Sequence, residues 1–221
     1  MKSLTKKKLI FLPAVAMTVL FSAAGCKGQS AHDVVRGIQN KANEKKNEFA
    51  LSGSWVSNCE PESIVPKFKA GREVYKFNVD GTFERRHYFF SESNCQSPSF
   101  VRIEKGGINF PETRDVKDGT PVDFSFKKVE VEVKDKTVAD VLNSIGYCDT
   151  HFDIGQKTDL TNASRLGLKC VGIKRTPRNT FTTMKLNGGQ LLVAGDASEE
   201  SVTDRPDVSD HSKVYVKGDL N

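Results

Sequence analysis

Short runs of alternating apolar and polar residues, separated by turn residues, constrain the fold of this chain more than any other feature. The clearest pair is 74–79 and 82–90, joined by Asp80-Gly81, a dipeptide that favours the tight turn of a β-hairpin. A second hairpin is predicted over 100–110, with Gly106-Gly107 as its turn. Further runs stand at 122–126, 129–133, 168–174, 181–186, 190–194 and 214–216. The pattern predicts an antiparallel, all-β domain over residues 51–221.

The number of runs predicts that the sheet closes on itself. A flat sheet of eight or nine strands would leave two long unpaired edges, which promote aggregation. Strand 190–194 carries Leu191, Leu192 and Val193 with no charge to protect such an edge. We therefore expect an up-and-down barrel of eight or nine strands, in which the strand after Gln190 pairs with the first strand near Trp55.

One helix interrupts the alternation in the middle of the chain. Val138, Val141, Leu142 and Ile145 recur at helical spacing, and Thr137 is suited to the N-cap position. We expect a short helix over 137–145 that covers an open end or an edge of the sheet.

The first 25 residues are typical of a bacterial secretion signal. Four lysines precede an apolar run, and Ala23-Ala24-Gly25-Cys26 resembles the lipobox of bacterial lipoproteins, although Leu is more usual at the position of Ala23. The resemblance implies that Cys26 is acylated and becomes the N-terminus of the mature protein, attached to the membrane without spanning it. An ordinary signal peptide with a coincidental cysteine is the alternative.

Residues 26–50 are predicted to tether the barrel domain to the membrane. They are polar, and a helix from about Ser30 to Lys45 fits a solvated spacer better than a partner-binding amphipathic helix. Lys27 is not the aspartate that retains lipoproteins at the inner membrane, which favours the periplasmic face of the outer membrane.

Charge argues against nucleic-acid binding. The 221 residues carry a net charge of +5, but four of these charges belong to the leader lysines, and residues 26–221 are left with +1. Such a balance lacks the basic excess of proteins that bind nucleic acid.

Four cysteines beyond Cys26 predict a disulfide framework, since exported chains are oxidised. Three pairings are open, and the sequence-local one, Cys59–Cys95 with Cys148–Cys170, is favoured. The rival interpretation of Cys148 with His151 is half of a zinc site, for which no second half exists in the sequence. We expect no metal and no cofactor.

Catalytic motifs are lacking, so we expect no enzyme. The sequence contains no nucleophile-elbow, Ser-x-x-Lys, zinc-protease or phosphate-loop motif. His87 lies in a predicted strand, where a satisfied or exposed histidine is more common than a catalytic base.

A resemblance is carried by the pattern Gly53-x-Trp55-Val56-x-x-Cys59, followed by Phe77-x-x-Asp80-Gly81-Thr82-Phe83, Tyr88, Cys95 and Gly106-Gly107. Over about residues 51–216 this pattern resembles bacterial lipocalin-like lipoproteins and the barrel repeat of the membrane-tethered, lipid-binding Wnt antagonist family. The resemblance implies a barrel whose mouth admits a small apolar molecule. It also implies that Trp55, behind a Gly53 that permits close backbone approach, closes the barrel against an arginine, either Arg205 or Arg175.

The main functional hypothesis is therefore a lipid-anchored barrel that binds a small apolar ligand such as a lipid or fatty acid. Its expected lining comprises the inward members of the strands: Phe77, Phe83, Tyr88, Phe100, Ile103, Phe124 and Phe126. The alternative is a filled barrel that contacts another envelope protein and holds no ligand. A hydrolase is the weakest alternative, because no motif supports it.

Overall fold

The computed structural model describes residues 39, 50–62, 68–111, 118–145, 148–194, 205–206, 208 and 212–220. The predicted signal peptide, Cys26 and most of the predicted tether lie outside these residues, so their assignments stay predictions. No helix in the described ranges is long and apolar enough to cross a membrane.

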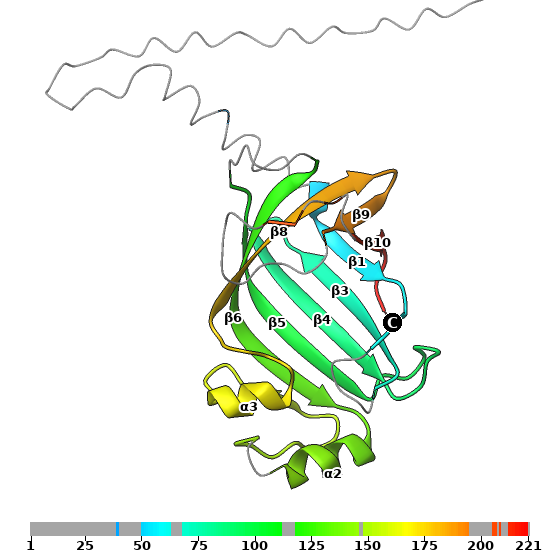
Figure 1. Ribbon diagram of the computed structural model, residues 1–221, viewed down its shortest axis with the longest axis vertical. Coiled ribbons are helices and arrows are strands. Elements are labelled where there is room, and N and C mark those ends of the chain that lie inside the picture. The colour runs from blue at the N-terminus through cyan, green and yellow to red at the C-terminus, as the bar shows by residue number, and fades with distance from the viewer. Residues whose placement is uncertain are drawn as a thin grey trace, which may run out of the picture.

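Ten strands and two helices make up the described part of the chain (Figure 1). The strands are β1 (Gly53–Ser57), β2 (Glu60–Pro61), β3 (Ala70–Phe77), β4 (Thr82–Phe90), β5 (Phe100–Asn109), β6 (Thr120–Val133), β7 (Lys157–Asp159), β8 (Arg178–Asn187), β9 (Gln190–Val193) and β10 (Lys213–Lys217). The helices are α2 (Lys136–Ser144) and α3 (Arg165–Cys170).

Eight of the strands form a closed antiparallel ring. The order is β1-β10-β9-β8-β6-β5-β4-β3, and β1 closes the ring by pairing with both β10 and β3. The short strands β2 and β7 add to β3 and β6 outside this ring. The predicted all-β barrel is confirmed, but β10 rather than β9 pairs with the first strand, because β10 inserts between β1 and β9.

The β3–β4 hairpin matches its prediction, whereas the hairpin predicted over 100–110 is wrong. Residues 100–109 form one continuous strand, β5, with a bulge between Lys105 and Gly106 where it pairs with β6. A Cβ on Gly106 would lie 1.8 Å from the backbone oxygen of Ser125. Gly106 is therefore required by the close approach of the neighbouring strand and not by a turn.

The mid-chain helix is confirmed as α2, with Asp135 as its N-cap in place of Thr137. The Asp135 side chain accepts a hydrogen bond from the Val138 backbone at 3.0 Å. The strand predicted over 168–174 is wrong, because the chain forms the short helix α3 there. Ser164 caps α3 by accepting a hydrogen bond from the Gly167 backbone at 3.1 Å.

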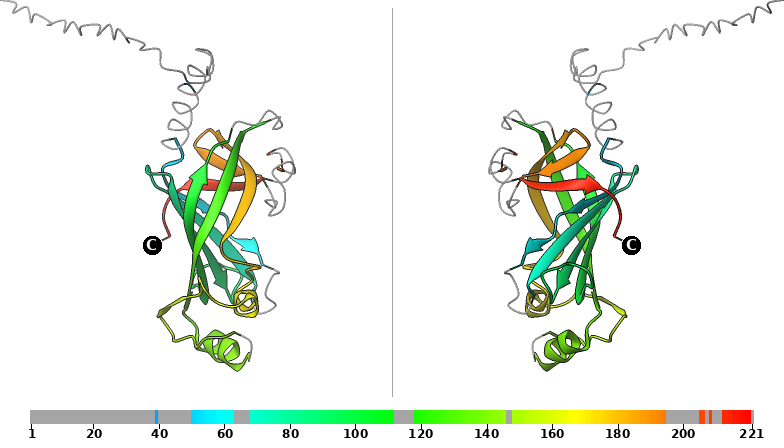
Figure 2. Two further views of the ribbon diagram at one scale, coloured as in Figure 1. Left: turned by 90° about the vertical axis from the view of Figure 1, so that its left-hand side faces the viewer. Right: turned by 90° about the vertical axis from the view of Figure 1, so that its right-hand side faces the viewer.

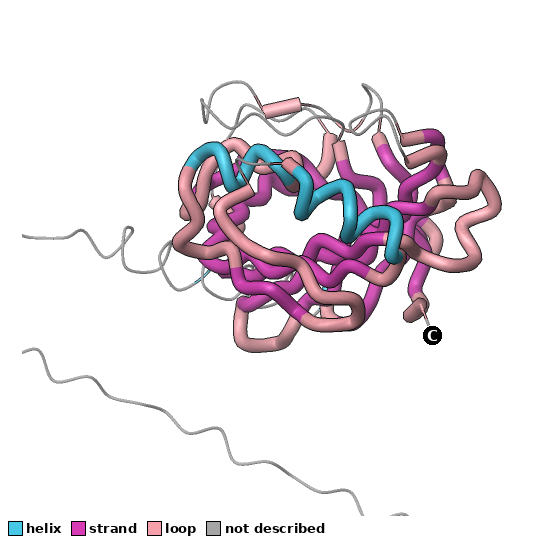
Figure 3. Tube along the Cα trace, turned by 90° about the horizontal axis from the view of Figure 1, so that it is seen from below, coloured by secondary structure: helices cyan, strands magenta, loops and turns pink. Residues whose placement is uncertain are grey.

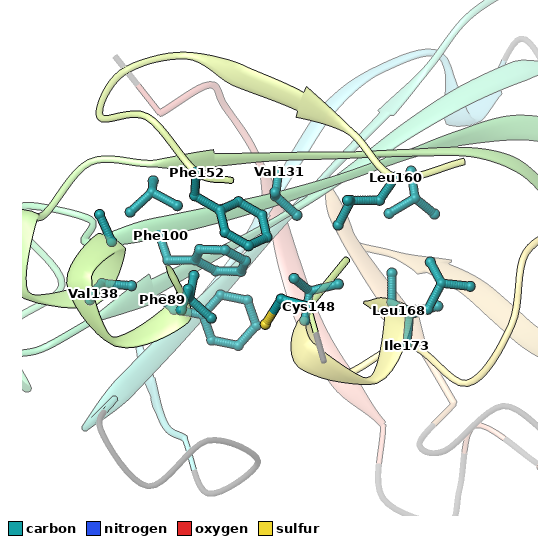
Figure 4. Close-up of a cluster of buried hydrophobic side chains, with 14 of the residues drawn as sticks. Phe89, Phe100, Val131, Val138, Cys148, Phe152, Leu160, Leu168 and Ile173 are labelled. Atoms are coloured by element: carbon teal, nitrogen blue, oxygen red, sulfur yellow. The ribbon is translucent and has the colours of Figure 1, made fainter. Parts of the chain in front are cut away.

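Two apolar clusters fill opposite ends of the barrel. The upper core lies at the end where β1 begins and comprises Leu51, Trp55, Tyr75, Phe77, Phe83, Val122, Phe124, Phe126, Met184, Leu191, Val193 and Tyr215. The lower core lies between the strands and helices α2 and α3 (Figure 4) and comprises Phe68, Phe89, Phe100, Val129, Val131, Val133, Val138, Ala139, Leu142, Cys148, Phe152, Leu160, Leu168, Val171 and Ile173. The side views show strands closing the upper end and helices lying below the lower end (Figure 2).

Both predicted disulfides are present. Cys59 is bonded to Cys95 with Cα atoms 6.0 Å apart, and Cys148 is bonded to Cys170 with Cα atoms 5.5 Å apart. Because Cys148 is oxidised, its thiolate is not available to the alternative zinc site with His151.

Trp55 is buried at the closing seam, with 2% of its surface exposed and its Nε1 donating to the Leu51 carbonyl at 2.7 Å. The predicted arginine contact is wrong. Arg205 instead donates to the carbonyls of Val122 and Thr182, on another part of the wall, and the cation over the Trp55 ring is Lys217, at 5.3 Å. Gly53 is required by its positive φ of 108°, since nothing lies near its Cβ position.

Candidate functional site

Four of the seven side chains predicted to line a ligand cavity pack against one another in the upper core. The ring centroid of Phe83 lies 4.7 Å from that of Phe124 and 5.1 Å from that of Phe126. Phe77 stacks on Phe124 at 6.3 Å. These rings contact one another inside the barrel, so they pack as a core.

The other three residues do not join them. Phe100 belongs to the lower core, where its ring lies 5.5 Å from that of Phe89. Tyr88 and Ile103 lie on strand positions of opposite parity to the inward residues Phe89 and Phe100, so they lie on the outer face of the wall. Tyr88 packs there against the Cys59–Cys95 disulfide cluster. The prediction that these two side chains point inward is wrong.

Between the two cores lies a group of mostly buried charged and polar side chains that sequence reasoning did not assign to the site. We call it the buried network: Glu62, Glu73, Arg85, His87, Arg102, Glu104, Arg178 and Tyr215, with the exposed Lys213 at its edge. Glu104, 1% exposed, is its centre. Its carboxylate oxygens lie 2.5 Å from Arg85 Nη2 and 2.5 Å from Arg178 Nη2, and Arg102 Nε lies 3.6 Å from Oε2.

Three guanidinium groups around one carboxylate dominate the local electrostatics. Burial raises the pKa of Glu104, but the charges of Arg85, Arg102 and Arg178 outweigh it and hold that pKa well below its usual range. Arg178 and Arg85 also lie over the face of Phe126, with guanidinium carbons 4.1 and 4.6 Å from the ring centroid. These two contacts connect the buried network to the upper core.

A second carboxylate, Glu73, organises the other side of the network. Tyr215 donates to Glu73 Oε2 at 2.7 Å, and Lys213 Nζ lies 3.5 Å from Oε1. Burial acts to raise the pKa of Glu73, but the positive charges of Lys213 and Arg85, together with that of His87 once it is protonated at low pH, lower it to about 2. Glu73 is therefore ionised at neutral pH.

His87 is held between two opposite partners. Its Nε2 lies 3.1 Å from Glu62 Oε2, and its Nδ1 lies 3.5 Å from Arg102 Nη2. Burial lowers the pKa of His87 despite the neighbouring carboxylates. A neutral ring that donates from Nε2 and accepts at Nδ1 satisfies both partners, which confirms the interpretation of His87 as a satisfied side chain.

The alternation that located the strands also contained a signal for this network. In β4 the residues that share parity are Phe83, Arg85, His87 and Phe89, so two charged or polar side chains occupy an otherwise aromatic face. Likewise Arg102 and Glu104 share parity with Phe100 in β5. Charged residues on the apolar face of a strand indicate a paired interior group.

A hollow at the lower end of the molecule is the largest of those described. We call it the α3 pocket: it is a hollow of about 570 Å³, open to solvent on one side, and it is lined by Arg165, Leu166, Lys169, Gly172, Ile173 and Lys174. Viewed from below, the two helices lie across this end of the barrel (Figure 3). Its volume is within the range of small-ligand sites.

The α3 pocket is tied to the barrel by fixed contacts. Arg102 Nη1 donates to the carbonyls of Val171 at 3.1 Å and Gly172 at 3.4 Å, which joins the pocket to the buried network. The Cys148–Cys170 disulfide holds the end of α3. The pocket is therefore pre-organised rather than formed by a free loop.

Two smaller hollows lie elsewhere. One of about 240 Å³ on the outer wall is lined by residues that include Val74, Arg86 and Tyr88, and one of about 160 Å³ at the upper end includes Leu51 and Leu186. Both fall below the usual range for ligand sites.

The class defined by these features is a small, disulfide-linked, closed antiparallel β-barrel with a charged interior and a helix-covered end. Residues 30–184, more than two thirds of the chain, match the family model described as Adenomatosis polyposis coli down-regulated 1. The chain belongs to this family. No curated protein matches it in a sequence search. The predicted resemblance to the Wnt antagonist family is thus confirmed, and the resemblance to bacterial lipocalin-like lipoproteins stays a prediction.

Proposed function

We propose that this chain is a lipid-anchored protein of the cell envelope whose barrel domain binds a small apolar or amphiphilic ligand. The α3 pocket is the observation that carries the proposal, because it combines ligand-sized volume with a fixed frame and an apolar floor at Ile173. The family match supports a barrel of a ligand-binding or interaction type. We place the proposed ligand site at the lower end, because aromatic rings pack against one another in the upper core.

A second candidate function is contact with another envelope protein, without a ligand. The mutual packing of the rings of Phe77, Phe83 and Phe124 favours it, because a barrel filled by its own side chains resembles a rigid scaffold more than a carrier. On this account the charged outer wall, where Lys105 pairs with Glu84 and Glu130, is the contact surface.

Native mass spectrometry of the full chain, released from membranes with mild detergent, separates the two candidates. A ligand-binding protein is expected to retain a copurified molecule of defined mass. A homogeneous, ligand-free mass that also fails to change with added fatty acid would contradict the first proposal and favour the second.

Anchoring is tested at Cys26. The serine substitution Cys26→Ser is expected to abolish incorporation of labelled palmitate and to release the protein from the membrane fraction, since the thiol that carries the acyl chain is gone. Cys26 follows a leader typical of secretion, and Lys27 favours the periplasmic face of the outer membrane. Unchanged labelling of the variant would refute the anchor while leaving the barrel's ligand unaffected.

A further inference from the structure

We propose that the α3 pocket recognises the anionic head of an amphiphile, a carboxylate or phosphate joined to an apolar chain. Arg165, Lys169 and Lys174 contact the head, and Leu166 and Ile173 contact the chain. The inference rests on the proposed ligand-binding function and names the chemical class of the ligand.

The charge of the lining is the first support. Three of its six residues are cationic, and none is acidic. Within the described ranges, Arg165, Lys169 and Lys174 make no ion pair, whereas lysines on the outer wall such as Lys105 and Lys128 are each paired with carboxylates. Three unpaired cations around one hollow attract an anion and repel a metal ion.

The second support is the apolar surface between these cations. Leu166 is 57% exposed beside these cations, while Ile173 is 4% exposed and forms the floor of the hollow. The aliphatic stems of the lysines extend this apolar surface. A purely hydrophilic anion would leave it uncovered, so the lining suits a ligand with both an anionic and an apolar part.

Rigidity is the third support. Gly167 is closely packed, because a Cβ there would lie 3.2 Å from the Cys148 carbonyl oxygen and 3.2 Å from a carboxylate oxygen of Asp149. The Ser164 cap, the Cys148–Cys170 disulfide and the Arg102 hydrogen bonds fix both ends of α3. A site held in this way loses little conformational entropy when a ligand binds. Arg102 is accordingly a positioning residue, since it acts through the carbonyls of Val171 and Gly172.

The position of the pocket favours a single amphiphile over a bilayer surface. The described chain enters the barrel at Leu51 in the upper core, and α3 lies at the opposite end (Figure 1). A domain held near a membrane by residues that precede Leu51 would direct α3 away from that membrane.

The test uses the full chain in phosphatidylcholine nanodiscs, titrated calorimetrically with octyl phosphate, octanoate and the neutral octanol, with empty nanodiscs subtracted. We expect both anions to bind at least about ten-fold more tightly than octanol, which corresponds to one charge-assisted hydrogen bond or more. The double variant Lys169→Glu, Lys174→Glu should weaken the anions at least about ten-fold and leave octanol unchanged.

Two further variants control for folding and for net charge. Lys127→Glu changes an exposed lysine of β6 outside the pocket and should bind like the native chain, which excludes a general effect of charge. The milder pair Lys169→Gln, Lys174→Gln keeps the test valid if the glutamates disturb α3. The variant Arg102→Gln should weaken octyl phosphate and octanol alike, because it loosens the pocket as a whole.

The outcomes separate this inference from the proposed function. Native-like anion binding by both double variants would overturn the inference, and a ligand that still copurifies with them would leave the proposed function intact at another site. If the native chain binds no probe and no ligand copurifies, both fail. Binding to phosphatidylglycerol vesicles that the double variants lose, without binding of octyl phosphate, would assign the surface to a bilayer and overturn the inference.

Discussion

The two ends of this barrel reach stability by different means. At the upper end strands close on one another, and aromatic side chains such as Phe83 and Phe124 occupy the interior. At the lower end β8 no longer pairs with β6, whose last residues pair with the short β7 instead, and α2, α3 and a disulfide complete the cover. The comparison indicates that the upper end is a scaffold, while the lower end, with looser closure, is suited to binding.

The largest effect is expected from Trp55→Ala, which tests the upper end as the stability centre. The substitution leaves a cavity at the seam and removes the hydrogen bond to Leu51, so the free energy of unfolding should fall by about 3–5 kcal/mol. Chemical denaturation followed by circular dichroism measures it. The control Trp55→Phe should lose clearly less, and equal losses would argue against a packed seam.

Next comes Glu104→Gln, which tests the boundary between the two ends. The amide keeps the shape of the side chain but leaves three buried guanidinium groups without their shared countercharge, so we expect a loss of about 3 kcal/mol in unfolding free energy. The matched change Glu84→Gln, on the outer wall, should lose under about 1 kcal/mol. Similar losses for the two variants would show that the buried network is not a structural centre.

Removal of the Cys148–Cys170 disulfide should destabilise the lower end of the barrel and leave the upper end unchanged. The variant Cys148→Ser, Cys170→Ser should lose about 2–3 kcal/mol. Hydrogen exchange should speed up in α3 and leave β8 and β9 unchanged. Uniform acceleration over both ends would mean that they unfold as a single unit.

The smallest effect expected is the pH dependence of stability between about pH 6.5 and 5, which tests His87. Because burial lowers the pKa of His87 below 6.5, the unfolded chain binds a proton that the folded chain does not, and stability falls as the pH drops below about 6.5. A second loss begins below about pH 4.5, because the folded pKa of Glu73 is about 2. His87→Gln should remove the first loss, about 1 kcal/mol per pH unit, and should reduce the second, because the protonated ring contributes to the lowered pKa of Glu73. The measurement is the midpoint of denaturation as a function of pH for the native chain and the His87→Gln variant. An equal slope for the two between pH 6.5 and 5 would contradict the assignment to His87.

The sequence predicted the local features well, because their causes lie within a few residues. The turn at Asp80-Gly81, the helix α2 and the alternation of β4 depend on neighbouring residues. Gly106 was misinterpreted as a turn residue, because its requirement comes from Ser125 on another strand. The strand predicted over 168–174 fails for the same reason. The Ser164 cap and the disulfide from Cys170 to the distant Cys148 favour the helix α3 over the strand that the alternating pattern predicts.

The candidate site was the less predictable part for the same reason. Arg85, Glu104 and Arg178 come from β4, β5 and β8, and only the closed ring brings them together. The residues predicted to line a ligand cavity share only their apolar character. Apolar character alone does not distinguish a packed core from a cavity.

The length of the barrel wall sets the distance between the α3 pocket and the upper end of the barrel. Strand β6 has 14 residues, and at about 3.3 Å per residue with a tilt of about 40° it rises roughly 35 Å along the barrel axis. If Cys26 is acylated, the rigid barrel wall separates the α3 pocket at the lower end from the membrane-anchored upper end by that height. Ligand exchange would then take place in solution, at about that distance from the membrane to which the protein stays attached.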